Sequence, residues 1–333
     1  MHTISVYVIV LCGAALLFDF LNGFHDAANS IATVVSTRVL RPLYAVVWAA
    51  CFNFIAVFLL GVKVADTVGS FLRKDAATNE VILSALVGAI AWNLLTWWLG
   101  LPTSSSHALI GGLAGAGIVA AGIGSLRLDS LLKIAIFIPL APVIGLVLGV
   151  VLRTLVSWVF HRSSPKTTGR VFRRLQLLSA ALYSLGHGTN DAQKTMGVIA
   201  LVLLNNRLLA TQELSIPTWV KIAAGIAISL GTMSGGWRIV KTMGMKITKL
   251  QPVDGFAAET AAALSLFGAT HAGIPVSTTH TITGAIVGVG STRRLSAVRW
   301  GVTIGVVWAW VLTIPGSALV AALTQFLLQV VHR

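Results

Sequence analysis

Long apolar stretches, rather than an alternation of apolar and polar positions, set the pattern of this chain. Each is of the length needed for a membrane-crossing helix, which takes about 20 residues. They lie near residues 4–24, 43–62, 81–100, 106–123 and 131–152, and then near 175–188, 195–204, 218–237, 255–270, 276–290 and 300–323. This pattern predicts an all-α integral membrane protein with about 10–12 transmembrane segments. No basic segment precedes the first run, from Ile4 to Phe24, so we interpret it as a membrane helix and not as a signal peptide.

The composition agrees with this interpretation. Hydrophobic residues make up 56% of the chain and charged residues 10%, whereas a soluble domain carries about 25% charged residues. The net charge of +14 would suit nucleic acid, but the basic residues cluster in the connections between apolar runs, as the positive-inside rule expects. We therefore expect a lipid bilayer around the protein and no nucleic-acid partner.

A basic segment, residues 153–174, separates two halves that repeat one another. Three motifs occur in the same order in residues 1–152 and in residues 175–333. The matching segments are 23–30 with 188–195, 61–69 with 236–244, and 102–107 with 275–280. This repetition predicts a duplicated fold in which the basic segment joins a first and a second repeat.

The two repeats are expected to have opposite orientations in the membrane. Five apolar runs precede the basic segment, and because this number is odd, matching loops fall on opposite sides. The basic residues of the linker place it in the cytoplasm and the N-terminus outside. Inverted repeats with broken or re-entrant helices are typical of secondary transporters.

Two carboxylates, Asp26 and Asp191, occupy matching places at or within apolar runs. A carboxylate near the middle of a bilayer costs about 2.5–3.5 kcal/mol, so it normally faces a wet cavity or binds a cation. Carboxylate, amide and hydroxyl oxygens suit hard cations such as sodium, and a carboxylate also accepts a proton. Capping of a helix at the membrane interface is the alternative, and the repetition of the pair favours cation sites.

The segments 102–107 and 275–280, with the sequences PTSSSH and PVSTTH, each break the chain before a new apolar run. Pro and Ser/Thr in this order predict the start of a helix. If the start lies within the membrane, its free N–H groups and positive dipole end would bind an anion, with the hydroxyls as further donors. Two such starts could converge on one oxyanion. Capping at the membrane interface is again the alternative.

Two further charged residues are rare in apolar surroundings. Lys194 stands where the first half has Asn29, and it could balance the charge of a substrate, pair with Asp191 or extend to the interface. Glu259 is another acid within an apolar run, for which a place in a cation pathway is favoured.

These motifs resemble those of the inorganic phosphate transporter (PiT) family. The resemblance covers nearly the whole chain. Its most specific parts are 188-GTNDAQKTMG-197, 252-PVDGFAAE-259 and 275-PVSTTH-280, with the first-half copies 23-GFHDAANSIAT-33 and 99-LGLPTSSSHALIGG-112. In this family phosphate and cations bind between two inverted repeats. The chain departs from the family at His25, where Asn is commoner.

The resemblance implies a set of site residues. The expected cation-binding residues are Asp26, Asn29, Asn190 and Asp191. The expected phosphate-binding residues are Ser104, Ser105, Ser106, Ser277, Thr278, Thr279, Gln193 and Lys194. His25 and Glu259 are candidates for a cation pathway, and the sequence assigns no resident metal.

We therefore expect a secondary active transporter that imports inorganic phosphate by alternating access, in symport with protons or sodium. A carrier of sulfate or of a neutral metal–phosphate complex is the alternative. His25 favours protons, because an imidazole titrates near neutral pH and replaces the amide oxygen that Asn would offer sodium. The short linker looks prokaryotic, which predicts a multi-pass protein of the plasma or inner membrane, and a homodimer is left open.

Other functional classes fit less well. A hydrolase built on Ser106, His107 and Asp26 is disfavoured, because adjacent Ser and His rarely form a catalytic pair and an enzyme needs only one nucleophile. A channel is also disfavoured, because a selectivity filter needs ring symmetry or a lined pore, and two inverted halves fit alternating access better. The chain has no GxxxxGK[ST] motif, so ATP is not expected to drive transport directly. We expect no enzymatic activity and no cofactor besides the co-transported ion.

Overall fold

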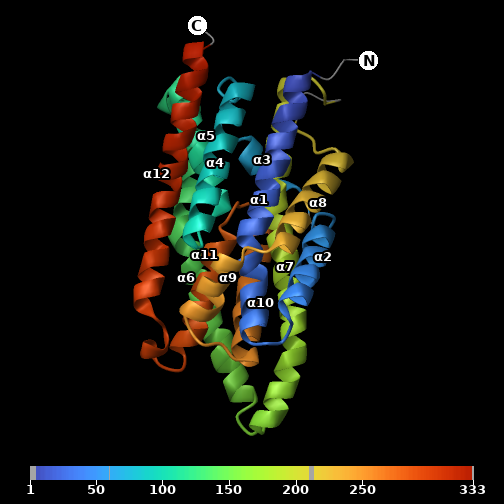
Figure 1. Ribbon diagram of the computed structural model, residues 1–333, viewed down its shortest axis with the longest axis vertical. Helices are drawn as coiled ribbons and strands as arrows, with labels where there is room; N and C mark the ends of the chain where they lie inside the picture. Colours follow the sequence, from blue (N-terminus) through green and yellow to red (C-terminus); the bar gives the residue numbers. More distant parts are fainter. Residues whose placement is uncertain (1–4, 60, 210–213, 332–333) are drawn as a thin grey trace.

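The computed structural model describes residues 5–59, 61–209 and 214–331, and it is built from α-helices (Figure 1). The helices of the first half are α1 (Val6–Ser36), α2 (Pro42–Ala56), α3 (Lys63–Gly69), α4 (Asn79–Leu99), α5 (Ser105–Ala121) and α6 (Leu128–Val159). Those of the second half are α7 (Pro165–Asn205), α8 (Thr218–Ser234), α9 (Trp237–Lys241), α10 (Pro252–His271), α11 (Thr278–Ser291) and α12 (Trp300–Val331). The described residues contain no β-strand, which confirms the predicted all-α class.

Both halves show the same order of helix lengths. A long helix opens and closes each half, with 31 residues in α1, 32 in α6, 41 in α7 and 32 in α12. A shorter helix, a very short helix and a pair of helices lie between them. In Figure 1, the start of α1 and the α4–α5 pair lie toward the end of the molecule that holds both termini. The start of α7 and helix α10 lie toward the opposite end. The inversion of one repeat relative to the other stays a prediction.

Four helices, α1, α4, α6 and α12, are long and apolar enough to cross a membrane, and α2 and α5 are shorter apolar helices. Several apolar runs do not coincide with single helices. The runs 175–188 and 195–204 lie together in α7, and the run 43–62 extends past the end of α2 at Ala56. The basic segment 153–174 is helical at both ends, since α6 continues to Val159 and α7 starts at Pro165.

The structure confirms both predicted helix starts. Ser104 is the N-cap of α5, and its hydroxyl accepts the N–H of His107 over 3.2 Å. Ser277 caps α11 in the same way, with the N–H of His280 at 3.1 Å. The rings of His107 and His280 meet edge to face with their centroids 4.7 Å apart. The two helix starts therefore lie side by side although they come from different halves of the chain.

Close helix packing holds the two halves together. α5 lies against α12, and a Cβ added at Gly115 would come within 2.2 Å of a backbone oxygen of α12. α11 lies against α6, and a Cβ added at Gly288 would come within 2.3 Å of a backbone oxygen of α6. Glycine permits such contact because it has no side chain. Each half thus packs its inner helix pair against the long closing helix of the other half.

Candidate functional site

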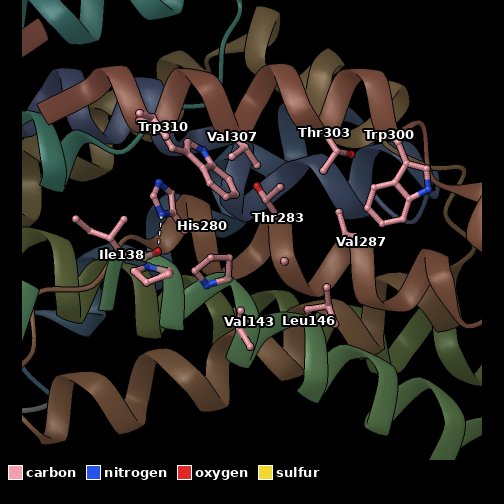
Figure 2. Close-up of a pocket in the computed structure, with 14 residues that line it drawn as sticks. Ile138, Val143, Leu146, His280, Thr283, Val287, Trp300, Thr303, Val307 and Trp310 are labelled. Atoms are coloured by element: carbon pink, nitrogen blue, oxygen red, sulfur yellow. Dashed lines mark hydrogen bonds between the residues drawn. The ribbon is translucent and has the colours of Figure 1, made fainter. Parts of the chain in front are cut away.

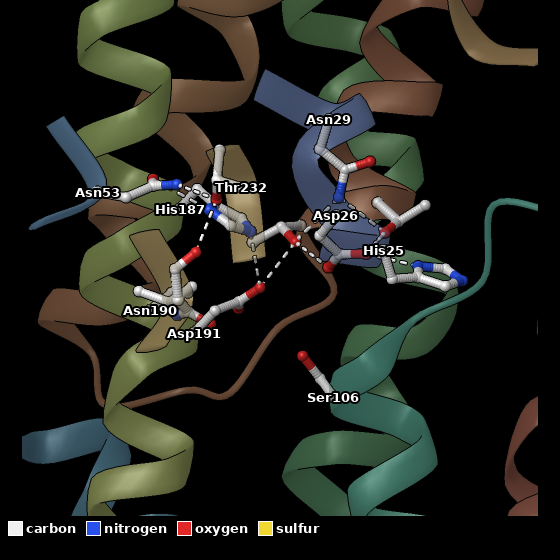
Figure 3. Close-up of polar contacts among 12 residues, drawn as sticks. His25, Asp26, Asn29, Asn53, Ser106, His187, Asn190, Asp191 and Thr232 are labelled. Atoms are coloured by element: carbon white, nitrogen blue, oxygen red, sulfur yellow. Dashed lines mark hydrogen bonds and ion pairs between the residues drawn. The ribbon is translucent and has the colours of Figure 1, made fainter. Parts of the chain in front are cut away.

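Asp26 of α1 and Asp191 of α7 lie in the interior, where the starts of α5 and α11 meet. Their exposed fractions are 2% and 0%. Each lies well inside its helix, so neither caps a helix end. In Figure 3 the two side chains point toward each other across the space between their helices.

The start of α11 connects the two carboxylates. Thr278 Oγ1 lies 3.1 Å from Asp191 Oδ2 and 3.4 Å from Asp26 Oδ2. Thr279 Oγ1 lies 3.4 Å from Asp26 Oδ1, and Asn29 Nδ2 donates to Thr279 Oγ1 over 2.9 Å. A hydroxyl has one proton, so Thr278 can donate to only one carboxylate at a time. The start of α11 therefore offers the two carboxylates only the hydroxyl protons of Thr278 and Thr279.

Lys194 supplies a positive charge to one of the carboxylates. Its Nζ donates hydrogen bonds to Asp191 Oδ1 and to Ser106 Oγ. The same nitrogen lies 3.2 Å from the carbonyl oxygen of Val276. The lysine is 1% exposed. Lys194 is thus paired with Asp191 and buried in the protein, and its role toward a substrate stays a prediction.

Two histidines complete the surroundings of the carboxylates. His25 Nδ1 lies 2.9 Å from Asp26 Oδ1, and its Nε2 lies 3.2 Å from the hydroxyl oxygen of Thr96 in α4. His187 Nε2 lies 3.2 Å from Asp191 Oδ2. One ligand atom from each of Asp26, His187 and Asp191 lies within 4.8 Å of the other two, a spacing that could hold a metal ion.

Most of the residues predicted from the sequence come together here. They are Asp26, Asn29, Asp191, Lys194, Ser106, Thr278 and Thr279, with His25 beside them. Ser105 is also buried, and its hydroxyl has no hydrogen-bond partner among the described residues. The hydroxyls of Ser104 and Ser277 are used as helix caps.

Asn190 and Gln193 point elsewhere on α7. Asn190 Nδ2 donates to Thr270 Oγ1 over 3.0 Å, at the end of α10. Gln193 Oε1 accepts the backbone N–H of Val64 over 3.0 Å, and its Nε2 donates to the carbonyl of Gly61 over 2.7 Å. Gln193 thereby holds the start of α3, and these bonds would have to break before it could contact an anion.

Glu259 of α10 belongs to a second buried polar cluster. Its carboxylate accepts Gln176 Nε2 over 3.0 Å and the hydroxyl of Ser179, both from α7. Gln176 in turn accepts the hydroxyl of Thr37, just after α1, over 2.9 Å. The acid is therefore satisfied by hydrogen bonds that connect three helices.

Among the buried polar residues near the site that the sequence did not predict are His187 and Asp19. His187 lies one turn before Asp191, and that spacing could have pointed to it, because residues four apart share a helix face. Asp19 of α1 is fully buried. Asp19 falls inside the first apolar run, where the hydropathy pattern predicts a membrane helix and no binding site.

A separate cavity of about 430 Å³ lies between α6, α11 and α12 (Figure 2). Its lining is mainly apolar, with Ile138, Val143 and Val307 among the side chains. His280 reaches it, stacked on Trp310 with 3.9 Å between the ring centroids. A site with so few donors does not suit a phosphate anion, so this cavity is not the anion site.

Residues 22–321 match the model of a protein family described as the phosphate transporter family. The chain belongs to this family. The expected resemblance to phosphate transporters is thus confirmed over nearly the whole chain. The site formed by α1, α5, α7 and α11 therefore lies in the interior of a protein of the phosphate transporter family.

Individual relatives agree with this placement. A probable low-affinity inorganic phosphate transporter of Rhizobium meliloti is 58% identical over 95% of both chains. One of Bacillus subtilis with the same description is 46% identical over 98% of both chains. A solved structure titled the sodium-dependent phosphate transporter is 26% identical, with a TM-score of 0.90 over 98% of this chain and 100% of the other.

Proposed function

We propose that this family member is a secondary active transporter that imports inorganic phosphate together with a cation. The names of its relatives support phosphate as the substrate. The observation that carries the proposal is the meeting of two buried helix starts, α5 and α11, beside two buried carboxylates. Helix starts and hydroxyls bind anions, and carboxylates bind cations, so one centre can hold both.

Electrostatics give a reason for coupling. Asp26 and Asp191 carry two negative charges, and Lys194 compensates for one. A phosphate at the helix starts would then lie near an uncompensated carboxylate, in an interior where charge repulsion is strong. A cation at Asp26 removes this repulsion and releases the hydroxyls of Thr278 and Thr279 to donate to phosphate. Each ion then favours the binding of the other, which is a favourable (negative) coupling free energy between the two sites.

The proposal assigns roles to the predicted residues. The phosphate-binding set is Ser104, Ser105, Ser106, Ser277, Thr278, Thr279, Gln193 and Lys194. The cation-binding set is Asp26, Asn29, Asn190 and Asp191, with His25 and Glu259 along the cation pathway. The unpartnered hydroxyl of Ser105 supports the first set, because a buried donor without a partner is costly unless a ligand satisfies it.

The transport cycle would follow alternating access between two inverted repeats. The lengths and directions of the helices in the two halves support this arrangement (Figure 1). The bacterial relatives and the short connection between α6 and α7 support a prokaryotic plasma membrane. A homodimer is compatible with this arrangement.

Protons and sodium are the two candidate coupling ions. The contact of His25 with Asp26 supports protons, because imidazole exchanges protons near neutral pH. The likeness to a sodium-dependent phosphate transporter supports sodium. Lys194 already fills the space beside Asp191 with an ammonium group, which leaves Asp26 as the more open of the two carboxylates.

A neutral metal–phosphate complex is the second candidate substrate. The observation that favours it is the group of Asp26, His187 and Asp191, whose ligand atoms lie within 4.8 Å of one another. Imidazole nitrogen and carboxylate oxygens together suit divalent transition metals better than sodium. In this case the metal would be cargo and would enter with the anion.

The test is uptake of radiolabelled phosphate by purified protein in liposomes. We expect phosphate accumulation driven by an inward proton or sodium gradient, inhibition by arsenate, and little inhibition by equal sulfate. Strict dependence on a divalent metal, with the metal entering in step with phosphate, would identify the complex as the substrate. Uptake that prefers sulfate, or the absence of any uptake, would contradict the proposal.

A further inference from the structure

Asp19 is a buried acid outside the centre described above. It lies on α1, seven residues before Asp26, or about 10 Å along the helix axis toward its N-terminus. Its exposed fraction is 0%. Neither of its carboxyl oxygens has a hydrogen-bond partner among the residues that the structure describes. None of the roles assigned so far uses this group.

Polar side chains also lie around Asp19. Asn22 of α1 and Thr195 of α7 lie beside it. Asn22 Oδ1 and Thr195 Oγ1 have no hydrogen-bond partner within residues 5–59, 61–209 and 214–331. The charged groups that face Asp19 are Asp191 and Lys194, both from α7. These two form an ion pair with each other, so their opposite fields at Asp19 partly cancel.

One proton would satisfy this group of atoms. A buried ionised carboxylate with no cation paired to it among the described residues is unfavourable by several kcal/mol. A neutral carboxyl group has an O–H that can donate to Asn22 Oδ1, while its carbonyl oxygen can accept the hydroxyl of Thr195. Protonation therefore supplies the missing donor and removes the uncompensated charge at the same time.

The repeat offers no second copy of this acid. Ser184 precedes Asp191 by the same seven residues. It is buried, and its hydroxyl has no hydrogen-bond partner in the part of the chain that the structure describes. A proton-binding group at this depth is thus present on α1 and not at the matching place of α7. Its charge acts on the centre directly, because an ionised Asp19 adds negative charge near Asp191 and opposes the entry of phosphate.

We propose that Asp19, with Asn22 and Thr195, binds the proton that is carried with phosphate. The proton joins a carboxyl oxygen of Asp19 from water on one side of the membrane, and that O–H bond breaks when the proton passes to water on the other side. This inference rests on the proposed function, and it adds to the cation site at Asp26 a proton-binding group at Asp19, with the proton as a coupling ion. Phosphate binds when Asp19 is neutral and is released when Asp19 ionises.

The experiment compares wild type, Asp19→Asn and Ser184→Ala in liposomes. Asn keeps the shape of Asp19 but does not bind and release a proton near neutral pH, and Ser184→Ala changes the matching position of α7. Exchange of labelled for unlabelled phosphate at equal pH measures binding and translocation. Accumulation under an inward proton gradient measures coupling, and each proton carried supports about tenfold accumulation per pH unit.

Wild type and Ser184→Ala should both exchange and accumulate phosphate, whereas Asp19→Asn should exchange it but reach an accumulation ratio near one. Accumulation by Asp19→Asn at the wild-type level would overturn the inference and leave the proposed function intact. So would loss of exchange in a variant that unfolds at the wild-type temperature, or wild-type accumulation that responds to sodium but not to protons. A wild type that neither exchanges nor accumulates phosphate would overturn the proposed function itself.

A spectroscopic measurement tests the proton without transport. The infrared spectrum of the purified wild type should contain the C=O band of a protonated carboxylic acid, and this band should be lost in Asp19→Asn but kept in Ser184→Ala. An unchanged band in Asp19→Asn would show that Asp19 does not hold the proton.

Discussion

Replacing Lys194 by Asn should convert Asp191 into a binding site for an external cation. The substitution gives the second half the residue that Asn29 provides in the first. It removes the ammonium group that is bonded to Asp191. The carboxylate then keeps His187 and Thr278 as its partners among the described residues. Neither carries the fixed positive charge that Lys194 supplies.

The loss of stability expected for Lys194→Asn follows from the burial of the Lys194–Asp191 ion pair. Removing one member of a buried ion pair costs about 3–5 kcal/mol, because the remaining charge is left uncompensated. Asp191 is 0% exposed and Lys194 is 1% exposed, so solvent does little to reduce this cost. A cation that binds the vacant place restores stability, by about 2.7 kcal/mol when its concentration is 100 times its Kd.

Thermal unfolding of the purified protein in detergent measures this effect. In choline chloride, Lys194→Asn should unfold at a lower temperature than wild type, and sodium chloride at the same ionic strength should raise its Tm by several degrees. Wild type and Lys194→Arg, which keep the positive charge, should show a clearly smaller sodium response, because Asp26 is then the one carboxylate of the pair that is open to the ion. An equal sodium response in all three proteins, or none in Lys194→Asn, would refute the idea that the ammonium occupies a cation site.

Three further predictions follow from the geometry. Replacing Ser105 and Thr278 together by Ala should weaken phosphate binding tenfold or more, because hydrogen bonds to a charged group contribute about 1.5–3 kcal/mol each; unchanged affinity in equilibrium binding would contradict their role. Asp26→Asn should abolish gradient-driven phosphate uptake in liposomes while the protein still folds, and normal accumulation would exclude Asp26 as a cation ligand. Gly288→Ala should lower the Tm, because its Cβ would come within 2.3 Å of a backbone oxygen of α6. Gly268→Ala meets nothing within 4 Å and should be neutral or stabilising, and equal effects of the two substitutions would show that the α11–α6 contact is not tight.

Local signals in the sequence predicted much of this fold. The Pro and Ser/Thr segments were expected to start helices, and Ser104 and Ser277 do cap α5 and α11. A cap depends on a few adjacent residues, so a short motif is enough to predict it. The ends of apolar runs were predicted less well. The run 43–62 extends past α2, which ends at Ala56, because hydropathy records how apolar a segment is and not where its helix stops.

The candidate site shows the same limit. The repeated motifs identified Asp26 and Asp191, since each lies in a pattern that occurs twice. Asp19 lies outside any repeated motif, and the reason to notice it is its burial next to Thr195 of another helix. Gln193 was expected at the anion, but it is bonded to the backbone at the start of α3. Which face of a helix meets which neighbour depends on contacts between distant segments, and no local pattern contains that information.

The difference between the two halves bears on how many cations must accompany phosphate. Two matching carboxylates with no resident positive charge would need two entering cations for compensation. Lys194 compensates for Asp191 from within the protein, which lowers that number by one. A negative-inside potential opposes the entry of an anion by about 2.3 kcal/mol per charge per 100 mV. With a monovalent phosphate and one cation the potential neither drives nor opposes uptake, so accumulation would depend on the concentration gradient of the coupling ion. A tethered ammonium in place of a mobile ion would therefore make transport less dependent on membrane voltage than in a protein with two open cation sites.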